Sequence, residues 1–193
     1  MFVLSLVILV NNYRLMSKKA EHSERQPGQV KNPAFTDSLT GVKSKLAYSE
    51  TESEINERIA TGMEAPFSVV VCDVNGLKFI NDNFGHKKGD ELIKNAAVMI
   101  CRLFMHSPVY RTGGDEFVVI ISDADYINRH VIMQKLHDLS VEHIETGEVV
   151  VSAGISDYEP GETHSFKAVF EKADALMYEE KKLLKSMGAA TRI

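Results

Sequence analysis

The feature that most constrains the fold is a short, nearly continuous apolar run, Phe67–Cys72 (FSVVVC), which ends at Asp73. Valine-rich runs of this length without a polar face are typical of strands that are buried on both sides of a sheet. We therefore predict a buried central strand at this position. The Asp73 carboxylate would then lie at the end of that strand.

The elements around this strand favour an α+β fold. The order is helix, strand, helix, helix, strand, strand, helix, strand, helix, which lacks the strict strand–helix alternation of a doubly wound parallel sheet. Gly113-Gly114 lies between two β-forming runs and indicates a tight hairpin, because glycine tolerates positive φ. We expect helices at Ser44–Ile59, Gly76–Asn83, Asp90–Phe104, Tyr126–Leu139 and Phe166–Lys185, and further strands at Val109–Thr112, Glu116–Ile121 and Glu148–Ile155.

Length and charge limit the class of protein. The 193 residues suffice for one well-cored domain with an appendage. The net charge of −5 disfavours binding to a nucleic acid polymer, although it leaves a small nucleotide open. The two cysteines, Cys72 and Cys101, each lie in an apolar run, so we expect buried thiols in a reducing compartment and no disulfide framework.

The N-terminus divides into segments of different character. Residues 1–16 begin with the uncharged run Met1–Val10, which is shorter than the roughly 20 residues that span a bilayer. Three interpretations stay open: a membrane anchor or the remnant of one, a signal-peptide hydrophobic region, and an apolar helix that packs on a partner. We expect a polar linker at residues 17–34, a compact domain at 35–187 and a C-terminal tail at 188–193.

Three acidic residues stand where strands begin or end. Asp73 closes the central strand, and Asp115 with Glu116 joins the glycine turn to the next strand. If the two strands are neighbours, the three carboxylates meet at one edge of the sheet and form a set of oxygen ligands that suits Mg²⁺ or Mn²⁺. The alternative is that Asp73 caps the next helix and the other two are solvated turn residues.

The segment Asp73–Asp90 is dense in polar side chains between two core elements. Lys78 is a candidate phosphate partner. Asn81 and Asp90 together offer the donors and acceptors that match the edge of a guanine base. Each of these residues, taken singly, is also compatible with a turn or a helix cap.

Four segments, in this order, resemble the GGDEF domains of diguanylate cyclases. The run TGGDEF at Thr112–Phe117 resembles the signature of the family, and Asp37–Gly41 (DSLTG) resembles its DxLTG opening. Asp73–Asp90 resembles the DxDxFKxxNDxxGHxxGD segment, and Ala173–Lys181 resembles the closing ADxALYxAK helix. The resemblance covers roughly residues 35–187 and is highly specific when its motifs are taken together.

The resemblance implies a fold like the nucleotidyl cyclase and polymerase palm, with a central, mainly antiparallel sheet flanked by helices. It implies a GTP-binding nucleotidyltransferase that condenses two GTP molecules into the signalling molecule cyclic di-GMP across a homodimer. Two Mg²⁺ or Mn²⁺ ions per active site are implied as cofactors. By motif position, the metal ligands would be Asp73, the Val74 carbonyl, Asp115 and Glu116; Asp115, Glu116 and Lys78 would serve catalysis; and Lys78, Lys181, Asn81, Asp90, Gly113 and Gly114 would bind the nucleotide.

The sequence also departs from the pattern of the family. Asn75 replaces the usual second aspartate after Asp73, and Leu184-Lys185 replaces the usual Gly-Arg after Lys181. The RxxD motif that mediates product inhibition in many cyclases is absent, because its positions hold Phe104 and Ser107. These departures leave open a catalytically inactive module that binds GTP or a protein partner. In either case the resemblance implies a cytoplasmic catalytic domain, with membrane contact only through the N-terminal segment.

Overall fold

The computed structural model of this protein describes residues 33–161 and 165–189. The predicted segment 1–16 and nearly all of the linker lie outside these residues, and the compact unit begins at Ala34. None of the helices in the described part of the chain is long and apolar enough to cross a membrane. The elements, in chain order, are η1 (Pro33–Phe35), α2 (Lys45–Ala60), β1 (Phe67–Val74), α3 (Leu77–Phe84), α4 (His86–Leu103), β2 (Val109–Arg111), β3 (Glu116–Ile121), α5 (Asp123–Thr146), β4 (Val151–Tyr158) and α6 (Phe166–Ser186).

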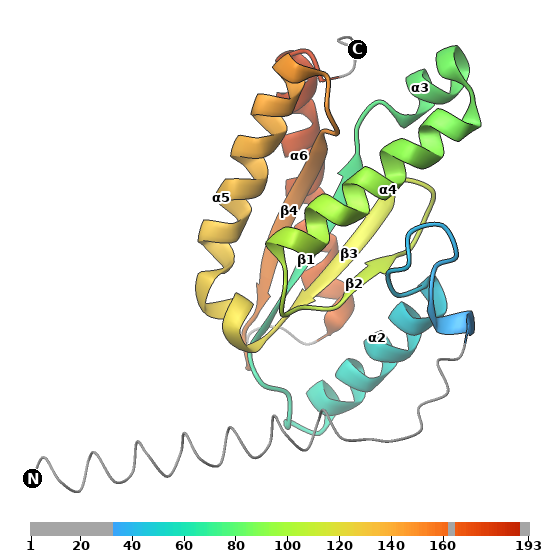
Figure 1. Cartoon of the computed structure of the whole chain (residues 1–193). Helices are drawn as coiled ribbons and strands as arrows, with labels where there is room; N and C mark the ends of the chain where they lie inside the picture. The colour runs from blue at the N-terminus through green and yellow to red at the C-terminus, as the bar shows by residue number, and fades with distance from the viewer. Residues whose placement is uncertain (1–32, 162–164, 190–193) are drawn as a thin grey trace, which may run out of the picture. The chain divides into compact units, whose positions relative to one another are not determined.

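Within the described residues, four strands form one antiparallel sheet in the order β2-β3-β1-β4 (Figure 1). The strand predicted from the valine-rich run is β1, and it lies between β3 and β4 with every residue buried. The hairpin predicted at Gly113-Gly114 joins β2 to β3. The prediction of an α+β, palm-like fold with a mainly antiparallel sheet is therefore confirmed.

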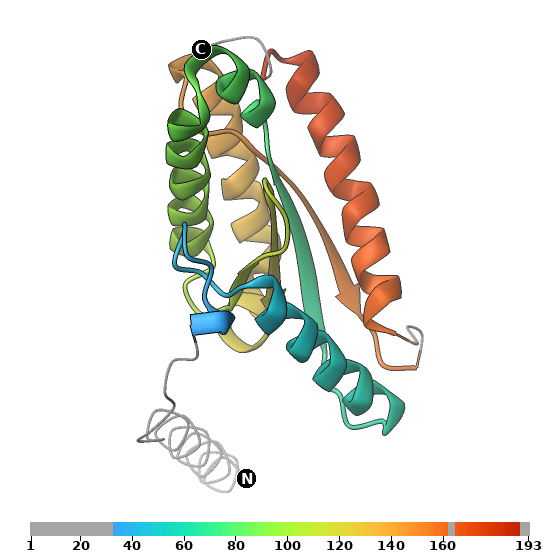
Figure 2. The same ribbon diagram turned by 90° about the vertical axis from the view of Figure 1, so that its right-hand side faces the viewer.

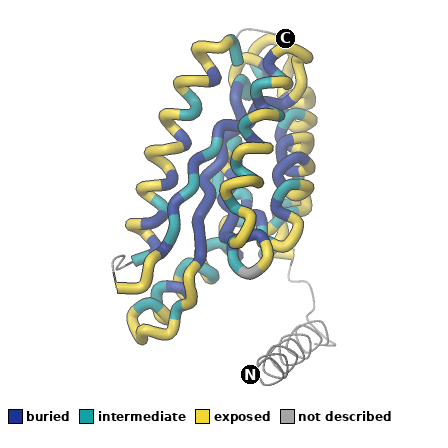
Figure 3. The backbone as a smooth tube through the Cα atoms, turned by 90° about the vertical axis from the view of Figure 1, so that its left-hand side faces the viewer, coloured by how far each residue is buried: buried dark blue, intermediate teal, exposed yellow. Residues whose placement is uncertain are grey.

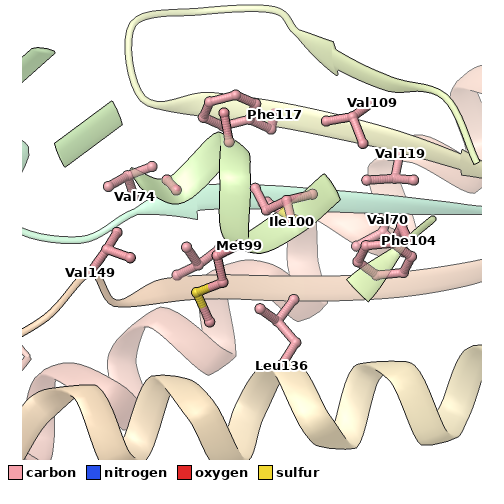
Figure 4. Close-up of a cluster of buried hydrophobic side chains, with 14 of the residues drawn as sticks. Val70, Val74, Met99, Ile100, Phe104, Val109, Phe117, Val119, Leu136 and Val149 are labelled. Atoms are coloured by element: carbon pink, nitrogen blue, oxygen red, sulfur yellow. The ribbon is translucent and has the colours of Figure 1, made fainter. Parts of the chain in front are cut away.

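Helices cover both faces of the sheet, and Figure 2 shows the sheet nearly edge-on between them. Side chains alternate along a strand, so Val70, Cys72 and Val74 of β1 face α4 and α5. Val69 and Val71 face α2 and α6. In Figure 4, Val70 and Val74 lie among apolar side chains from α4, α5 and the neighbouring strands.

The burial pattern follows from this layering. In Figure 3 the strands are buried along nearly their whole length, whereas the helices alternate between buried and exposed positions. This alternation is the pattern that amphipathic helices on a two-sided sheet must have. The odd-numbered positions of β1 face α6, and Asp73 belongs to that series, so its position in the strand aims it at α6.

Several details differ from the sequence-based expectations. Helix α5 is longer than predicted and ends before Gly147, whose positive φ of 76° terminates the helix. Strand β4 begins at Val151, three residues later than expected, because side chains of α5 take up the backbone groups ahead of it: His143 Nδ1 lies 2.6 Å from the Val149 carbonyl oxygen. Cys72 is buried, and burial raises the pKa of its thiol to about 12, but Cys101 is exposed and is no core residue.

Candidate active site

Asp73 and Glu116 are direct partners across the β1–β3 pair. Partners in an antiparallel pair point to the same face of the sheet, because the side-chain period of both strands is two. Val71 lies two residues before Asp73, and Val118 lies two residues after Glu116. Both valines face α2 and α6. The two carboxylates therefore share the face that α6 covers. The expected meeting of the strand end with the glycine turn is confirmed.

Asp115 completes this group of acids. The backbone N–H of Val74 donates a hydrogen bond to the Asp115 carbonyl oxygen, at 3.0 Å. This bond connects the end of β1 to residues 112–115, which join β2 to β3 and are called the signature turn below. The negative charge of the Asp115 side chain also raises the pKa of Asp73, so the two carboxylates interact. Asp115 thus lies near the Asp73–Glu116 pair at the end of β1.

A lysine from α6 neutralises part of this charge. Lys181 Nζ lies 2.6 Å from Asp73 Oδ1, and both side chains are largely covered, with exposures of 24% and 10%. Burial raises the pKa of Asp73, the hydrogen bond and the charge of Lys181 lower it, and the net shift is upward. Lys185 lies one turn further along α6 and also lowers the pKa of Asp73, so this lysine keeps a positive charge near the site.

The site has two acidic side chains in register and a third beside them, but no closed cage. Among the side chains of residues 33–161 and 165–189, no three of the His, Cys, Asp and Glu groups converge closely enough to hold a metal ion. Mg²⁺ is usually held by one or two carboxylates together with the phosphates of a substrate, so the oxygen donors here fit such an ion. The ammonium group of Lys181 already lies against Asp73, so this carboxylate has a place for a cation beside it.

The glycine turn packs closely on this pair. A Cβ atom added to Gly113 would lie 2.6 Å from Glu116 Oε2, so the missing side chain leaves room for this carboxylate. Gly114 has open space around it. The two glycines are not among the positive-φ glycines of the described chain, so the expectation that the turn exploits positive φ is wrong; close approach is the reason for Gly113.

Arg111 connects the signature turn to the loop that carries Asp37. Its Nη2 donates to the Gly114 carbonyl oxygen at 2.8 Å, and its Nη1 donates to Asp37 Oδ1 at 3.1 Å. Asp37 also accepts hydrogen bonds from the backbone and the side chain of Thr40. Burial pushes the pKa of Asp37 upward, but the bonds from Thr40 and Arg111 outweigh it and hold the pKa below its usual value. The opening DSLTG segment is thereby connected to the signature turn.

The candidate base-reading residues lie on the helical hairpin α3–α4. The Asn81 side chain rests on Gly89 of α4, since a Cβ added there would lie 2.0 Å from Asn81 Oδ1. Asp90 follows Gly89 directly and is exposed. Asn81 therefore lies against the residue that directly precedes Asp90. Lys78, on the first turn of α3, is exposed, and it forms no hydrogen bond or ion pair with other described residues.

A cavity of about 770 Å³ lies beside this hairpin and is separate from the acidic group. Its walls come from α3, α4 and the C-terminal end of α5, and it contains none of the residues predicted to serve catalysis or base reading. The Asp73–Lys181 pair lies outside this cavity and is largely covered, whereas Glu116 beside it is exposed.

Sequence reasoning missed two features that position the site. The clamp of Arg111 on Asp37 was not expected, because no local pattern links residues so far apart. Gly154 of β4 was not singled out either, although a Cβ there would lie 2.2 Å from the backbone oxygen of Ala173 and from the backbone nitrogen of Met177 in α6. A glycine inside a strand is itself a signal of close backbone approach and could have revealed this contact.

Comparison with known proteins defines the class. The family model described as diguanylate cyclase, GGDEF domain, matches residues 34–186. The fold, the paired acids and this match together show that the chain belongs to the GGDEF-domain family.

Named relatives and solved structures agree with this assignment. The chain is 33% identical over 171 residues to the diguanylate cyclase DgcP of Pseudomonas aeruginosa, covering 85% of this chain and 25% of DgcP. It is 29% identical over 152 residues to the diguanylate cyclase DgcS of Shewanella oneidensis, covering 77% and 50%. The chain thus spans a quarter to a half of these relatives. The crystallised GGDEF domain of DgcB from Caulobacter crescentus, solved in complex with c-di-GMP, is similar with a TM-score of 0.62 and 29% identity, covering 82% of this chain and 93% of that domain.

Proposed function

We propose that this chain is a diguanylate cyclase, which condenses two GTP molecules into cyclic di-GMP and releases pyrophosphate. The observation that carries the proposal is the pairing of Asp73 with Glu116 on the face of the sheet from which Lys181 approaches. Family membership supports the same reaction. The named relatives are diguanylate cyclases, and their activity is extended to this chain as a proposal.

We assign the cation site to oxygen donors at the sheet edge. Asp73, Asp115 and Glu116, together with the Val74 carbonyl, would hold two Mg²⁺ or Mn²⁺ ions. Such ions, when bound, neutralise phosphate charge and lower the pKa of a coordinated hydroxyl. The Val74 carbonyl is suited to this role because it shares its peptide plane with the Asn75 N–H, which donates to the Val150 carbonyl oxygen at 2.9 Å and so limits motion of that plane.

The remaining roles follow from the chemistry of the side chains. In each half-reaction the 3′-oxygen of one GTP bonds to the α-phosphorus of the other, the bond from that phosphorus to pyrophosphate breaks, and the hydroxyl proton passes to a carboxylate, which we assign to Glu116. Lys181 and Lys78 would neutralise the triphosphate, with Lys181 exchanging its bond to Asp73 for a phosphate oxygen. Asn81 and Asp90 would read the guanine edge, and the missing side chains of Gly113 and Gly114 would admit the nucleotide.

Catalysis requires two subunits in this proposal. One domain holds one GTP, so the attacking hydroxyl must come from a second copy that faces the first. Correct positioning of the two nucleotides can supply roughly 7–11 kcal/mol of the barrier. We therefore expect the rate per subunit to rise with protein concentration until the dimer saturates. We also place the reaction in the cytoplasm, where GTP is supplied, and leave any membrane contact to the N-terminal segment.

Product analysis tests the proposal. The purified chain is incubated with GTP and Mg²⁺ at several protein concentrations, and nucleotides are separated by chromatography. We expect cyclic di-GMP and pyrophosphate, with none formed by Asp115→Ala, whose circular dichroism should match the wild type. A demonstrated dimer that binds GTP and yields no product would instead identify a non-catalytic GTP-binding module.

A further inference from the structure

Gly89 forms a notch in the surface of α4, and the end of the Asn81 side chain fills it. An ideal Cβ on Gly89 would lie 2.0 Å from Asn81 Oδ1 and 2.9 Å from Asn81 Cγ. The third closest atom is Leu77 Cδ1 at 3.1 Å, so Asn81 Nδ2 lies further away than the oxygen does. The carboxamide therefore enters the notch with its oxygen end.

The backbone conformation at position 89 does not require glycine. It lies inside the first turns of α4, is buried, and is not among the positive-φ glycines of the described chain. Glycine inside a helix is less favourable than alanine, because it loses more backbone entropy on folding. The benefit must therefore come from the missing side chain, and the atom that occupies the space belongs to Asn81.

We infer that Gly89 is a positioning residue for guanine recognition, because the space left by its missing side chain sets where the Asn81 carboxamide lies. No hydrogen bond within the described residues holds this carboxamide, so its donors and acceptor are available to the base. The Asp90 carboxylate, on the next residue of α4, is available to the donors of the base. The inference rests on the proposed function, because it concerns the recognition of GTP by these two residues.

This role predicts an unusual variant. In Gly89→Ala the new methyl group meets the end of a flexible side chain rather than backbone, so Asn81 can swing away and the helix can stay intact. Alanine also favours the helix, so the melting temperature should rise by about 2 °C. Recognition of guanine should weaken in the same variant, because the displaced amide no longer faces the base.

A double-mutant cycle tests the inference on the full chain. Wild type, Gly89→Ala, Asn81→Ala and the double variant are titrated calorimetrically, in Mg²⁺, with guanosine 5′-(α,β-methylene)triphosphate, which resists condensation. Gly89→Ala and Asn81→Ala should each weaken binding roughly tenfold, as expected for the loss of one or two hydrogen bonds. The double variant should bind as Asn81→Ala does, because the methyl group then has no amide to displace.

Three outcomes decide against the inference. Wild-type affinity in Gly89→Ala would overturn it, and so would a further loss of affinity in the double variant, which would give Gly89 a role independent of Asn81. Loss of the cooperative unfolding transition in Gly89→Ala would show that the notch serves packing alone. If the wild type binds the analogue but forms no product from GTP, the cyclase proposal fails while the inference stands.

Discussion

Lys181 and Asp73 meet at 2.6 Å, although one lies near the end of the last helix and the other at the end of the central strand. The contact requires α6 to lie close against the sheet, because the lysine must reach the end of β1 from the helix. The close approach is allowed by Gly154, which has no side chain to hold the helix away. The charge balance of the site therefore depends on the packing of α6.

Gly154→Ala is expected to destabilise the protein strongly. The new Cβ would lie 2.2 Å from two backbone atoms of α6, and backbone cannot move aside as a side chain can. We expect a loss of about 3 kcal/mol in the free energy of unfolding, which overpacking of this kind costs. Chemical denaturation with circular dichroism measures it.

Gly114→Ala is the matched control for that variant. No atom lies within 4 Å of the place where its Cβ would be. The free energy of unfolding should stay within about 0.5 kcal/mol of the wild type. Equal destabilisation of the two variants would refute the idea that close approach of α6 explains Gly154.

Asp73→Asn is expected to stabilise the fold at neutral pH while abolishing cyclic di-GMP formation. Burial raises the pKa of Asp73 in the folded state, so folding disfavours the ionised form. The penalty is relieved as the pH falls below the unfolded-state pKa, and it is fully present once the pH exceeds the folded-state pKa. The gain in the free energy of unfolding should therefore be larger at about pH 7 than at about pH 4, as measured by urea unfolding.

Asp90→Asn serves as the control for this effect, because Asp90 is exposed and should leave stability unchanged. A drop in the stability of Asp73→Asn at neutral pH would mean that the ion pair with Lys181 outweighs desolvation, contrary to the direction of the pKa shift. In that case the site would be stabilising in the absence of substrate. A site that costs stability is instead the usual sign of a group kept for function.

Arg111→Lys should break the double contact by which Arg111 joins Asp37 to the signature turn. Lysine keeps the charge but lacks the fork that contacts Asp37 and the Gly114 carbonyl at the same time. We expect a loss of about 1–2 kcal/mol in the free energy of unfolding and a fall in kcat, because the turn carries Asp115 and Glu116. The side chains of Arg111 and Asp37 are mostly covered, with exposures of 13% and 21%, so screening of this ion pair by solvent is limited.

The same clamp gives a pH dependence of known sign. The pKa of Asp37 is held below its usual value, so the stability it contributes is present above the unfolded-state pKa. That contribution is lost as the pH falls through the folded-state pKa. The difference in the free energy of unfolding between wild type and Asp37→Asn should therefore shrink on acidification. A difference that stayed constant down to about pH 2 would contradict the ionic origin of the clamp.

The sequence predicted the parts of the fold and site that depend on local pattern. The valine-rich run identified β1, and the turn glycines identified the β2–β3 hairpin, because strand burial and turn geometry are encoded in adjacent residues. The contacts that order the site are long-range. Arg111 with Asp37 and Lys181 with Asp73 each join separate elements, and only the packing of helix and loop against the sheet brings them together.

Errors in the prediction have the same physical origin. Helical spacing from Val169 and Ala173 would place Leu176 on the buried face of α6, but Leu176 is 47% exposed, and Met177 is buried instead. The helical period allows either position, and only the packing of α6 on the sheet, where its backbone approaches Gly154 closely, distinguishes them. Cys101 was expected to be buried because its neighbours are apolar, yet it lies on the outer side of α4. A single helical turn carries both faces, so apolar neighbours do not fix burial.

If the chain has the proposed cyclase activity, added cyclic di-GMP should leave its initial rate unchanged at micromolar concentrations. The positions that would carry an RxxD motif are both used by the fold: Phe104 is buried in the core, and Ser107 Oγ donates to Asp125 Oδ2 at 2.7 Å. Phe104 is also among the apolar side chains shown in Figure 4. A substitution of Phe104 by arginine would bury an unpaired charge, so the motif has no room at this position without unfolding. Initial rates of pyrophosphate release, measured at fixed GTP with increasing product, check the prediction; a clear fall in rate would mean that product binds through a different set of residues.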